Sequence, residues 1–282
     1  MGYRTYNGSS NEGELNAKLR DLMIRRLKKE VMAELPDKIR QYHYVELTAK
    51  ESKSYHAEQQ SVLASIVSDK QYNGGGVRSN SGADALVALT HLRHLCGLMK
   101  VNAAISYVNE YRMNNDKPLL MFTHHKDVLD NIYTGLRNLT NPPRIGLITG
   151  DVASEKRQQV VDQFQSGNLD VVLATTPAAK EGLTLTAADT VVFVEREWSP
   201  SHEEQAEDRV NRIGQDADTV WAVYLTVSGS IDEKFNRVVE EKREVIKAVL
   251  DGGEIGERNS IVSELLKEMM KDGNRKAKEY FY

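Results

Sequence analysis

The stretch QAEDRVNRIGQ at residues 205–215 places one amide and two guanidinium groups at regular intervals. Gln205, Arg209 and Arg212 stand at positions i, i+4 and i+7, so a helix would project all three from one face. Two guanidinium groups held together repel each other unless an anion lies between them, and arginine offers planar, bidentate donors to phosphate. The spacing therefore suggests a polyphosphate ligand. The same residues allow a second interpretation, in which Asp208 pairs with Arg212 on a solvated helix face.

The elements that must position these groups are short apolar runs that alternate with amphipathic segments from residue 118 onward. This alternation is typical of a parallel sheet covered by helices on both faces, and ligands of such sheets bind at the carboxyl ends of the strands. We expect strands at 119–123, 145–149, 171–175, 190–194 and 220–225, and helices at 126–138, 154–165, 178–182 and 201–211. The functional loops should then be 124–125, 149–151, 175–182 and 195–201.

The rest of the chain is expected to be mainly helical. From residue 14 to Val31 the apolar residues recur at helical spacing above a basic polar face, and Leu35-Pro36 ends this predicted helix. A short strand is expected at 42–47, where apolar and polar residues alternate. Further helices are expected at 49–68, 83–98, 101–114, 230–250 and 260–279, with a Gly/Ser/Asn loop at 73–82.

Composition excludes several classes of protein. The 282 residues include 37 Lys and Arg against 41 Asp and Glu, a formal net charge of −4, which excludes a polybasic protein and predicts weak DNA binding by this chain alone. Cys96 is the only cysteine, so no disulfide can form within the chain, and His91, His94 and Cys96 do not complete a metal site. No apolar run or signal-type stretch predicts a membrane span or secretion. We expect a cytoplasmic protein in a prokaryote or phage and a nuclear one in a eukaryote.

The stretch 205–215 also resembles motif VI of the SWI/SNF-type ATPases of helicase superfamily two, in which Ile213-Gly214-Gln215 is the usual continuation. Other segments resemble the family's motif IV, motif V, the segment between them and the link between its two motor lobes, in the family's order. They are LLMFTHH at 119–125, TTPAAKEGLTLTAADTVVF at 175–193, LITGDVASEKRQQVVDQF at 147–164 and RRLKKEVMAELPDK at 25–38. YNGSSNEGEL at 6–15, FTHHK at 122–126 and QAEDRVNRIGQ look most like the HARP (HepA-related) annealing helicases, which rewind DNA.

The resemblance implies an α/β fold with a RecA-like parallel sheet, helices on both faces, an inserted helical subdomain and a C-terminal brace helix. It covers essentially residues 1–250. The expected division is an inter-lobe linker and basic helix at 1–40, a helical accessory subdomain at 41–116, the RecA-like C-terminal helicase lobe at 117–228, and brace and terminal helices at 229–282.

The resemblance also assigns a nucleotide role to four residues. Arg209 and Arg212 match arginines that reach the γ-phosphate of ATP across a cleft, where they stabilise charge during phosphoryl transfer. Gln205 would help seat them. Gly182 would line the nucleotide side of the cleft.

A second set of residues matches the family's grip on DNA. Thr149, Gly150 and Thr175 fall where the second lobe holds one strand by its phosphates, and Trp198 matches an aromatic that contacts DNA. Lys180 stands at a turn where the family usually has glycine, so it is expected to add a phosphate contact. The alternatives are that the two threonines cap loops at strand ends and that Trp198 packs under motif VI.

Two motifs of ATP-hydrolysing motors are missing from the sequence. It contains neither G-x-x-x-x-G-K-[ST] nor an Asp-Glu-x-His box, and the family keeps both in its first lobe. The resemblance therefore implies the second lobe of an ATP-dependent double-stranded DNA translocase, of DNA-remodelling or fork-annealing type, inactive alone. ATP with Mg²⁺ would be held mainly by the first lobe, and this chain would hold no metal.

The partners implied are an N-terminal RecA-like lobe, fused or separate, and double-stranded or forked DNA. The main alternative is a non-enzymatic DNA- or partner-binding module that keeps the lobe fold. Retention of both Arg209 and Arg212 favours the motor, because a binding module needs no γ-phosphate ligands. A motor acting on RNA is a third possibility, against which only the segments at 25–38 and 205–215 argue.

Overall fold

The computed structural model describes residues 8–9, 12–26, 28–32, 34–72, 81–178, 182–251 and 258–259. The chain forms two compact units. Unit 1 comprises Met1–Arg25, Leu47–Leu95 and Lys234–Tyr282, and unit 2 comprises Arg26–Glu46 and Cys96–Glu233.

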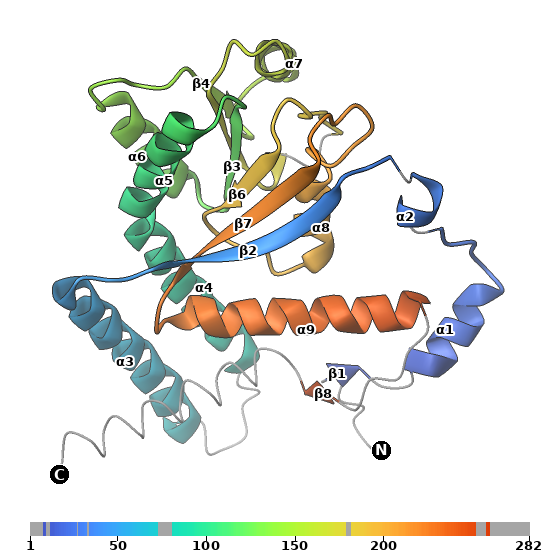
Figure 1. Cartoon of the computed structure of the whole chain (residues 1–282). Coiled ribbons are helices and arrows are strands. Elements are labelled where there is room, and N and C mark those ends of the chain that lie inside the picture. Colours follow the sequence, from blue (N-terminus) through green and yellow to red (C-terminus); the bar gives the residue numbers. More distant parts are fainter. Residues whose placement is uncertain are drawn as a thin grey trace. The chain divides into compact units, whose positions relative to one another are not determined.

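Unit 2 is built on a six-stranded sheet whose strand order is β2-β7-β6-β3-β5-β4 (Figure 1). All neighbouring strands are parallel. The strands are β2 Asp37–Val45, β3 Leu119–Thr123, β4 Ile145–Ile148, β5 Val171–Thr175, β6 Thr190–Phe193 and β7 Thr219–Val227. Every residue of β3, β5 and β6 is buried, because their side chains are covered on both faces of the sheet. The predicted α/β fold with a covered parallel sheet is confirmed.

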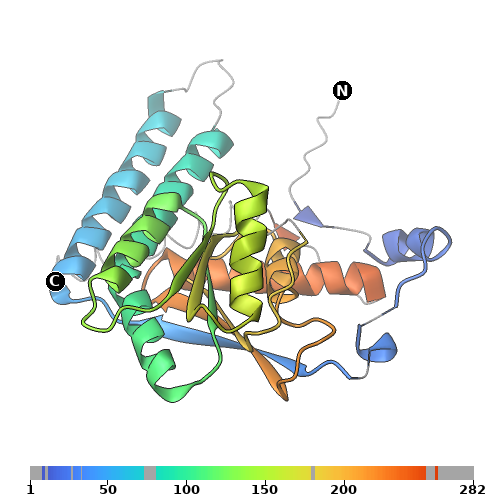
Figure 2. The ribbon, with the colours of Figure 1, turned by 90° about the horizontal axis from the view of Figure 1, so that it is seen from above.

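Alternate residues of the central strands feed two separate cores. Leu120 and Phe122 belong to a core that includes Phe164 and Ala206, which come from α7 (Ser154–Gln165) and α8 (Pro200–Glu207). Leu119 belongs to the opposite core, to which α5 (Val101–Asn114) and α6 (Lys126–Arg137) contribute. Figures 1 and 2 show these helix pairs on the two sides of the sheet. The four helices thus leave the loops at the carboxyl ends of the strands as the place for a site.

The strand β2 corrects the sequence analysis. A strand was expected at 42–47 within a helical block, whereas β2 spans Asp37–Val45 and pairs with β7 from Asp37↔Thr219 to Val45↔Val227. The expected boundary at residue 40 therefore falls inside a strand of the main sheet. Because β2 lies at the end of the strand order, its burial only alternates, and its basic residues hide the strand pattern.

Unit 1 contains α1, α3, most of α4, most of α9 and a short antiparallel pair of strands. Their bounds are α1 Glu12–Arg20, α3 Ala49–Tyr72, α4 Ser81–Met99, α9 Ile231–Asp251, β1 Gly8–Ser9 and β8 Arg258–Asn259. The helices predicted at 49–68, 83–98, 101–114 and 230–250 are confirmed as α3, α4, α5 and α9. The terminal helix predicted at 260–279 lies outside the described residues, as do residues 73–80 of the predicted loop and 179–181 of the helix predicted at 178–182.

The single basic helix predicted from residue 14 to Val31 is wrong. The helix α1 ends at Arg20, and a separate four-residue helix, α2 (Lys28–Val31), begins after an irregular stretch. Leu22 and Met23, the members of the apolar repeat in that stretch, are 83% and 37% exposed, so the repeat gains little core packing that would hold the helix together.

In the parts of the chain that the structure describes, every helix is too short or too polar to cross a membrane.

Candidate functional site

The helix α8 ends at Glu207, earlier than the predicted end at residue 211. Arg209 and Arg212 therefore do not share a helix face with Gln205, and the prediction of one helical face is wrong. After Glu207 the hydrogen bonds tighten from the helical i−4 pattern into turns. The Arg209 and Val210 amides donate to the Ala206 and Glu207 carbonyls at 3.1 Å each, and the Arg212 amide donates to the Val210 carbonyl at 3.0 Å. The Leu185 amide then donates to the Arg209 carbonyl at 2.9 Å and holds this turn against another loop.

The Arg212 side chain contacts the loop that follows β5. Its guanidinium Nη1 donates to the carbonyls of Gly182 and Leu183 at 3.3 and 3.5 Å and to Thr184 Oγ1 at 3.1 Å. The Arg212 side chain remains exposed, and Gly182 has a positive φ of 24°. The structure thus brings together two of the four residues predicted to bind nucleotide.

Arg209 lies close enough to Arg212 for their charges to interact. Burial lowers the pKa of Arg209, the positive charge of Arg212 lowers it further, and Asp208 opposes this effect. Asp208 forms ion pairs with Lys28 and Lys38 at 2.6 and 3.3 Å, in place of the pairing with Arg212 that the sequence also allowed. An anion between the two guanidinium groups would remove their repulsion.

Gln205, the fourth predicted residue, lies on α8 with an exposed side chain. The opposite face of α8 is fixed by Glu203, which is fully buried. Arg196 Nε and Nη2 donate to the two Glu203 carboxylate oxygens at 2.8 and 2.6 Å, and the Glu197 amide donates to Glu203 Oε1 at 3.1 Å. This pair holds α8 against the loop that follows β6.

Glu207 is the second buried carboxylate of α8. Arg40 donates to its two oxygens at 2.7 Å each, Lys38 Nζ lies 2.6 Å from Oε2, and the Tyr224 hydroxyl donates to Oε1 at 2.5 Å. Burial alone would raise the pKa of Glu207, but the hydrogen bond from Arg40 and the charge of Lys38 lower it to about 2. The sequence analysis missed both glutamates, although an acidic pair at i, i+4 within a motif helix, after a basic strand, could have indicated them.

The predicted DNA residues lie at the ends of two neighbouring strands. Thr149 and Gly150 follow β4, and Thr175 ends β5, directly after the register pair Ile148↔Ala174. Arg157 fixes the Thr149–Gly150 loop, because its guanidinium donates to the Gly150 and Val152 carbonyls at 3.2 and 2.7 Å.

Exposure differs among these residues. Thr149 and Thr175 are buried, at 7% and 8% exposure, whereas Gly150 is exposed. Trp198 is half-buried in the loop after β6. Lys180 lies outside the described residues. Of the five predicted residues, the structure thus brings Thr149, Gly150 and Thr175 to one edge.

The same edge is held together by Glu195. Its Oε2 accepts the His124 and His125 amides at 3.0 and 2.9 Å, at the start of α6, and its Oε1 lies 2.6 Å from His125 Nδ1. Burial raises the pKa of Glu195, but the hydrogen bonds of His125 outweigh this and lower it. Next to this pair, His124 Nδ1 lies 2.8 Å from Glu197 Oε1. The loops after β3 and β6 are therefore tied by charge-assisted hydrogen bonds.

Gly97 approaches Glu195 so closely that we expect Gly97→Ala to destabilise the protein. A Cβ at residue 97 would lie 2.6 Å from Glu195 Oε1 and 3.1 Å from Val128 Cγ2, so the carboxylate must move away from the His124 and His125 amides. Overpacking of this kind costs about 1–3 kcal/mol of unfolding free energy. Urea unfolding measures the change, with Gly150→Ala as the matched control, because a Cβ there meets nothing within 4 Å. Equal stability of the two variants would contradict the packing described.

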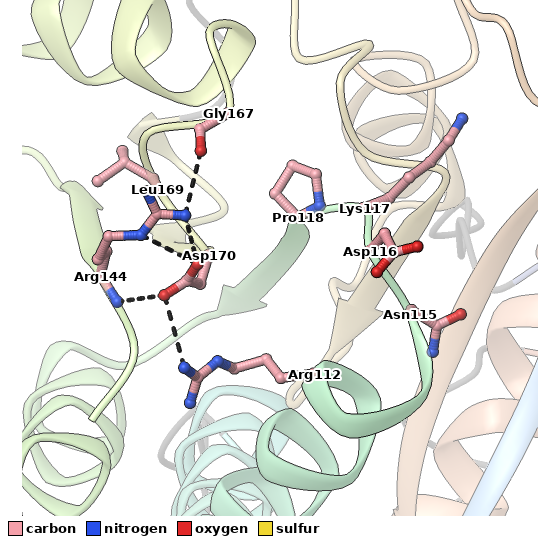
Figure 3. A pocket seen from close by; sticks show the side chains of 9 residues that line it. All are labelled: Arg112, Asn115, Asp116, Lys117, Pro118, Arg144, Gly167, Leu169 and Asp170. Atoms are coloured by element: carbon pink, nitrogen blue, oxygen red, sulfur yellow. Dashed lines mark hydrogen bonds and ion pairs between the residues drawn. The ribbon is translucent and has the colours of Figure 1, made fainter. Parts of the chain in front are cut away.

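A pocket lies at the opposite, amino-terminal edge of the sheet and is shown in Figure 3. Its positive charges are engaged by carboxylates of the chain. Arg144 pairs with Asp170 at 2.7 Å, Arg112 lies 3.6 Å from the same carboxylate, and Lys117 pairs with Asp216 at 2.6 Å. This pocket therefore offers no anion site comparable with the arginine pair.

Comparison with known proteins finds related families. The model of the helicase conserved C-terminal domain matches residues 99–214, and that of the SNF2-related domain matches residues 5–100. The human DNA annealing helicase and endonuclease ZRANB3 is 33% identical over 249 residues, covering 87% of this chain. The chain spans only 22% of that relative.

Two solved structures share the fold. The C-terminal part of the Fun30 ATPase domain has a TM-score of 0.61 and 17% identity, over 86% of this chain and 99% of that one. The Sulfolobus solfataricus SWI2/SNF2 ATPase core in complex with double-stranded DNA has a TM-score of 0.60 and 24% identity, over 85% of this chain and 52% of that one. The two family models match in succession, so residues 5–214 of this chain carry an SNF2-related segment followed by a helicase conserved C-terminal domain, as the resemblance implied.

Proposed function

We propose that this chain acts as the second RecA-like lobe of an ATP-dependent, double-stranded DNA translocase. The observation that carries the proposal is the arginine pair. Arg212 rests on the loop carbonyls after β5, and burial together with the positive charge of Arg212 lowers the pKa of Arg209. Two such groups fit the γ-phosphate of a nucleotide.

The nucleotide would be presented by another lobe. The sequence has no Walker A loop to cradle phosphates and no Asp-Glu-x-His box to position Mg²⁺. Arg209 and Arg212 would donate hydrogen bonds to the phosphate from across the interface, Gly182 would line the cleft, and Gln205 would seat the arginines. When bound, ATP with Mg²⁺ supplies the phosphoryl group, and the arginines stabilise the negative charge that develops on it. The match to almost all of the Fun30 C-terminal part supports the assignment to a second lobe.

DNA would bind at the edge formed by Thr149, Gly150 and Thr175, with contributions from Trp198 and Lys180. The exposed Gly150 lets a phosphate approach the backbone, and such contacts ignore base sequence, as translocation requires. The likeness to an ATPase core solved with double-stranded DNA and to an annealing helicase supports duplex or forked DNA as the substrate.

The first test is ATP turnover with and without a first lobe. We expect negligible turnover from the 282-residue chain alone, with or without duplex DNA, and DNA-stimulated turnover when a Walker-containing first lobe is supplied as a fused or separate chain. A coupled assay of phosphate release measures both. Turnover by the chain alone that disappears in Arg212→Ala would contradict the proposal. DNA binding without turnover in the joined protein would favour the alternative, a binding module that keeps the lobe fold.

A further inference from the structure

The chain from α2 into β2, here called the basic segment, contacts the end of α8 through three basic side chains. Lys28, from α2, lies 2.6 Å from Asp208 Oδ2. Lys38, from β2, bridges Glu207 at 2.6 Å and Asp208 at 3.3 Å, and Arg40 binds Glu207. All of these residues belong to unit 2, in which β2, α8 and α2 are seen in Figure 1. The basic segment therefore contacts the two carboxylates that immediately precede Arg209.

The two carboxylates have different surroundings. The Glu207 side chain is fully buried, whereas the Asp208 and Lys28 side chains are 31% and 52% exposed. Exposed ion pairs contribute little to folding stability. The Lys28–Asp208 pair can thus be removed without unfolding the protein, which separates its role from that of the buried network around Glu207.

The Asp208 carboxylate can compete with a phosphate for the guanidinium group of Arg209. Its negative charge acts on Arg209 in the direction opposite to that of Arg212. A carboxylate of the chain that moved onto Arg209 would occupy donors that a phosphate needs, because guanidinium binds both anions through the same planar fork. Lys28 and Lys38 bind this carboxylate on the side of the basic segment.

We propose that Lys28 is a positioning residue for the arginine pair: it holds the Asp208 carboxylate towards the basic segment, so that Arg209 and Arg212 present their positive charge to a phosphate. The inference rests on the proposed function and names a residue that the motif comparison did not assign. Lys28 touches no substrate in this arrangement and acts only through Asp208. Its loss should leave Asp208 with only the longer contact to Lys38, at 3.3 Å, so that the carboxylate can move towards Arg209 and weaken the contribution of the pair to turnover.

The first test uses the 282-residue chain without any ligand. The Arg209 Nε–Hε resonance, assigned by its absence in Arg209→Lys, is compared in the wild type, Lys28→Ala, Lys28→Arg and Lys117→Ala. We expect a downfield shift in Lys28→Ala, as Asp208 engages Arg209, and little change in Lys28→Arg. Lys117→Ala is the matched control, because it removes a 2.6 Å lysine–aspartate pair at the other edge of the sheet. An unmoved resonance in Lys28→Ala would overturn the inference.

The second test measures ATP turnover by the chain joined to its first lobe. Misplacement of a catalytic group by about 1 Å can cost on the order of 100-fold, so we expect Lys28→Ala to lower kcat by about 10- to 100-fold. Lys28→Arg and Lys117→Ala should stay near the wild type, and DNA affinity should not change. In the double variant Lys28→Ala/Asp208→Asn the loss should largely disappear, because the competing carboxylate is gone.

The outcomes separate the two proposals. If Arg212→Ala abolishes turnover but Lys28→Ala behaves like Lys117→Ala, the inference about Lys28 fails and the proposed function stands. If the joined wild type has no turnover, the proposed function fails, and the Arg209 resonance alone decides whether Lys28 controls Asp208. A melting shift in Lys28→Ala that accounts for its loss of turnover and persists in the double variant would overturn the positioning role.

Discussion

Replacing Arg212 by alanine is expected to abolish ATP turnover by the chain joined to its first lobe and to leave DNA affinity intact. An arginine donated to the γ-phosphate contributes roughly 10³–10⁵ in rate, because it stabilises charge that develops only in the transition state. The residues proposed to bind DNA follow β4 and end β5, and they do not include this side chain. Steady-state phosphate release and the salt dependence of duplex binding measure the two effects on the same protein.

A purely structural role of Arg212 predicts a different result. The side chain is exposed, and its hydrogen bonds to the Gly182 and Leu183 carbonyls and to Thr184 should contribute about 0.5–1.5 kcal/mol to stability. Arg137→Ala is the matched control, since Arg137 is also an exposed arginine whose hydrogen bond, to Tyr133, lies within its own helix. Near-normal turnover in Arg212→Ala would end the catalytic assignment. A large fall in melting temperature would assign the residue to the fold.

Thr175→Val separates the two sites from the other direction. It should weaken the stimulation of turnover by DNA before it affects basal turnover, because the proposed phosphate grip lies at the end of β5. Equal losses of stimulated and basal turnover would place Thr175 in the fold, as a strand-end residue that caps its loop. The Thr175 side chain is only 8% exposed, and this burial is what a loop-capping role would require.

Local pattern was sufficient to predict the central sheet. The runs at β3 and β5 were predicted to the residue, and β4, β6 and β7 to within two residues at each end, because a strand buried on both faces reads as a continuous apolar run. The strand β2 was placed too late, because an edge strand that carries Lys38 and Arg40 lacks this pattern. Its basic residues are explained by partners about 170 residues away, which no local window contains.

The geometry of the candidate site was predicted only in part. The argument that two close arginines favour an anion needed only their residue types, and it stays a prediction. The single helical face was wrong because the chain turns after Glu207, where the Arg209 and Val210 amides bind carbonyls three residues earlier and Leu185, in another loop, binds the Arg209 carbonyl. Glu203 and Glu207 were missed because their ion pairs with Arg196, Lys38 and Arg40 become visible only in the folded chain.

Glu207→Gln is expected to be the most destabilising of the conservative substitutions considered. Breaking a buried ion pair by removing one partner typically costs about 3–5 kcal/mol, because the remaining charges stay buried without compensation. Here the amide would leave Lys38 and Arg40 with only their longer contacts to Asp208 and Glu204, at 3.3 and 3.6 Å, and would weaken the hydrogen bond of the Tyr224 hydroxyl. Urea unfolding at pH 7 measures the loss. Glu204→Gln is the matched control, on the same helix and 3.6 Å from Arg40 but 44% exposed, and should change stability by less than about 1 kcal/mol.

The stability difference between wild type and Glu207→Gln should decrease as the pH falls. Glu207 has a pKa of about 2 in the folded protein, against an ordinary value of 4.5, so its stabilisation is fully present above about pH 4.5. It is lost as the pH falls from there towards 2, and it amounts to about 3 kcal/mol at most. The stability gap between wild type and Glu207→Gln should therefore be constant from pH 7 to 5 and narrow below pH 4.5. A gap that stayed constant to pH 3 would show that Glu207 stabilises α8 through packing rather than charge. Equal stability of wild type and Glu207→Gln at pH 7 would show that the ion pairs of Glu207 do not hold the turn that carries Arg209 and Arg212.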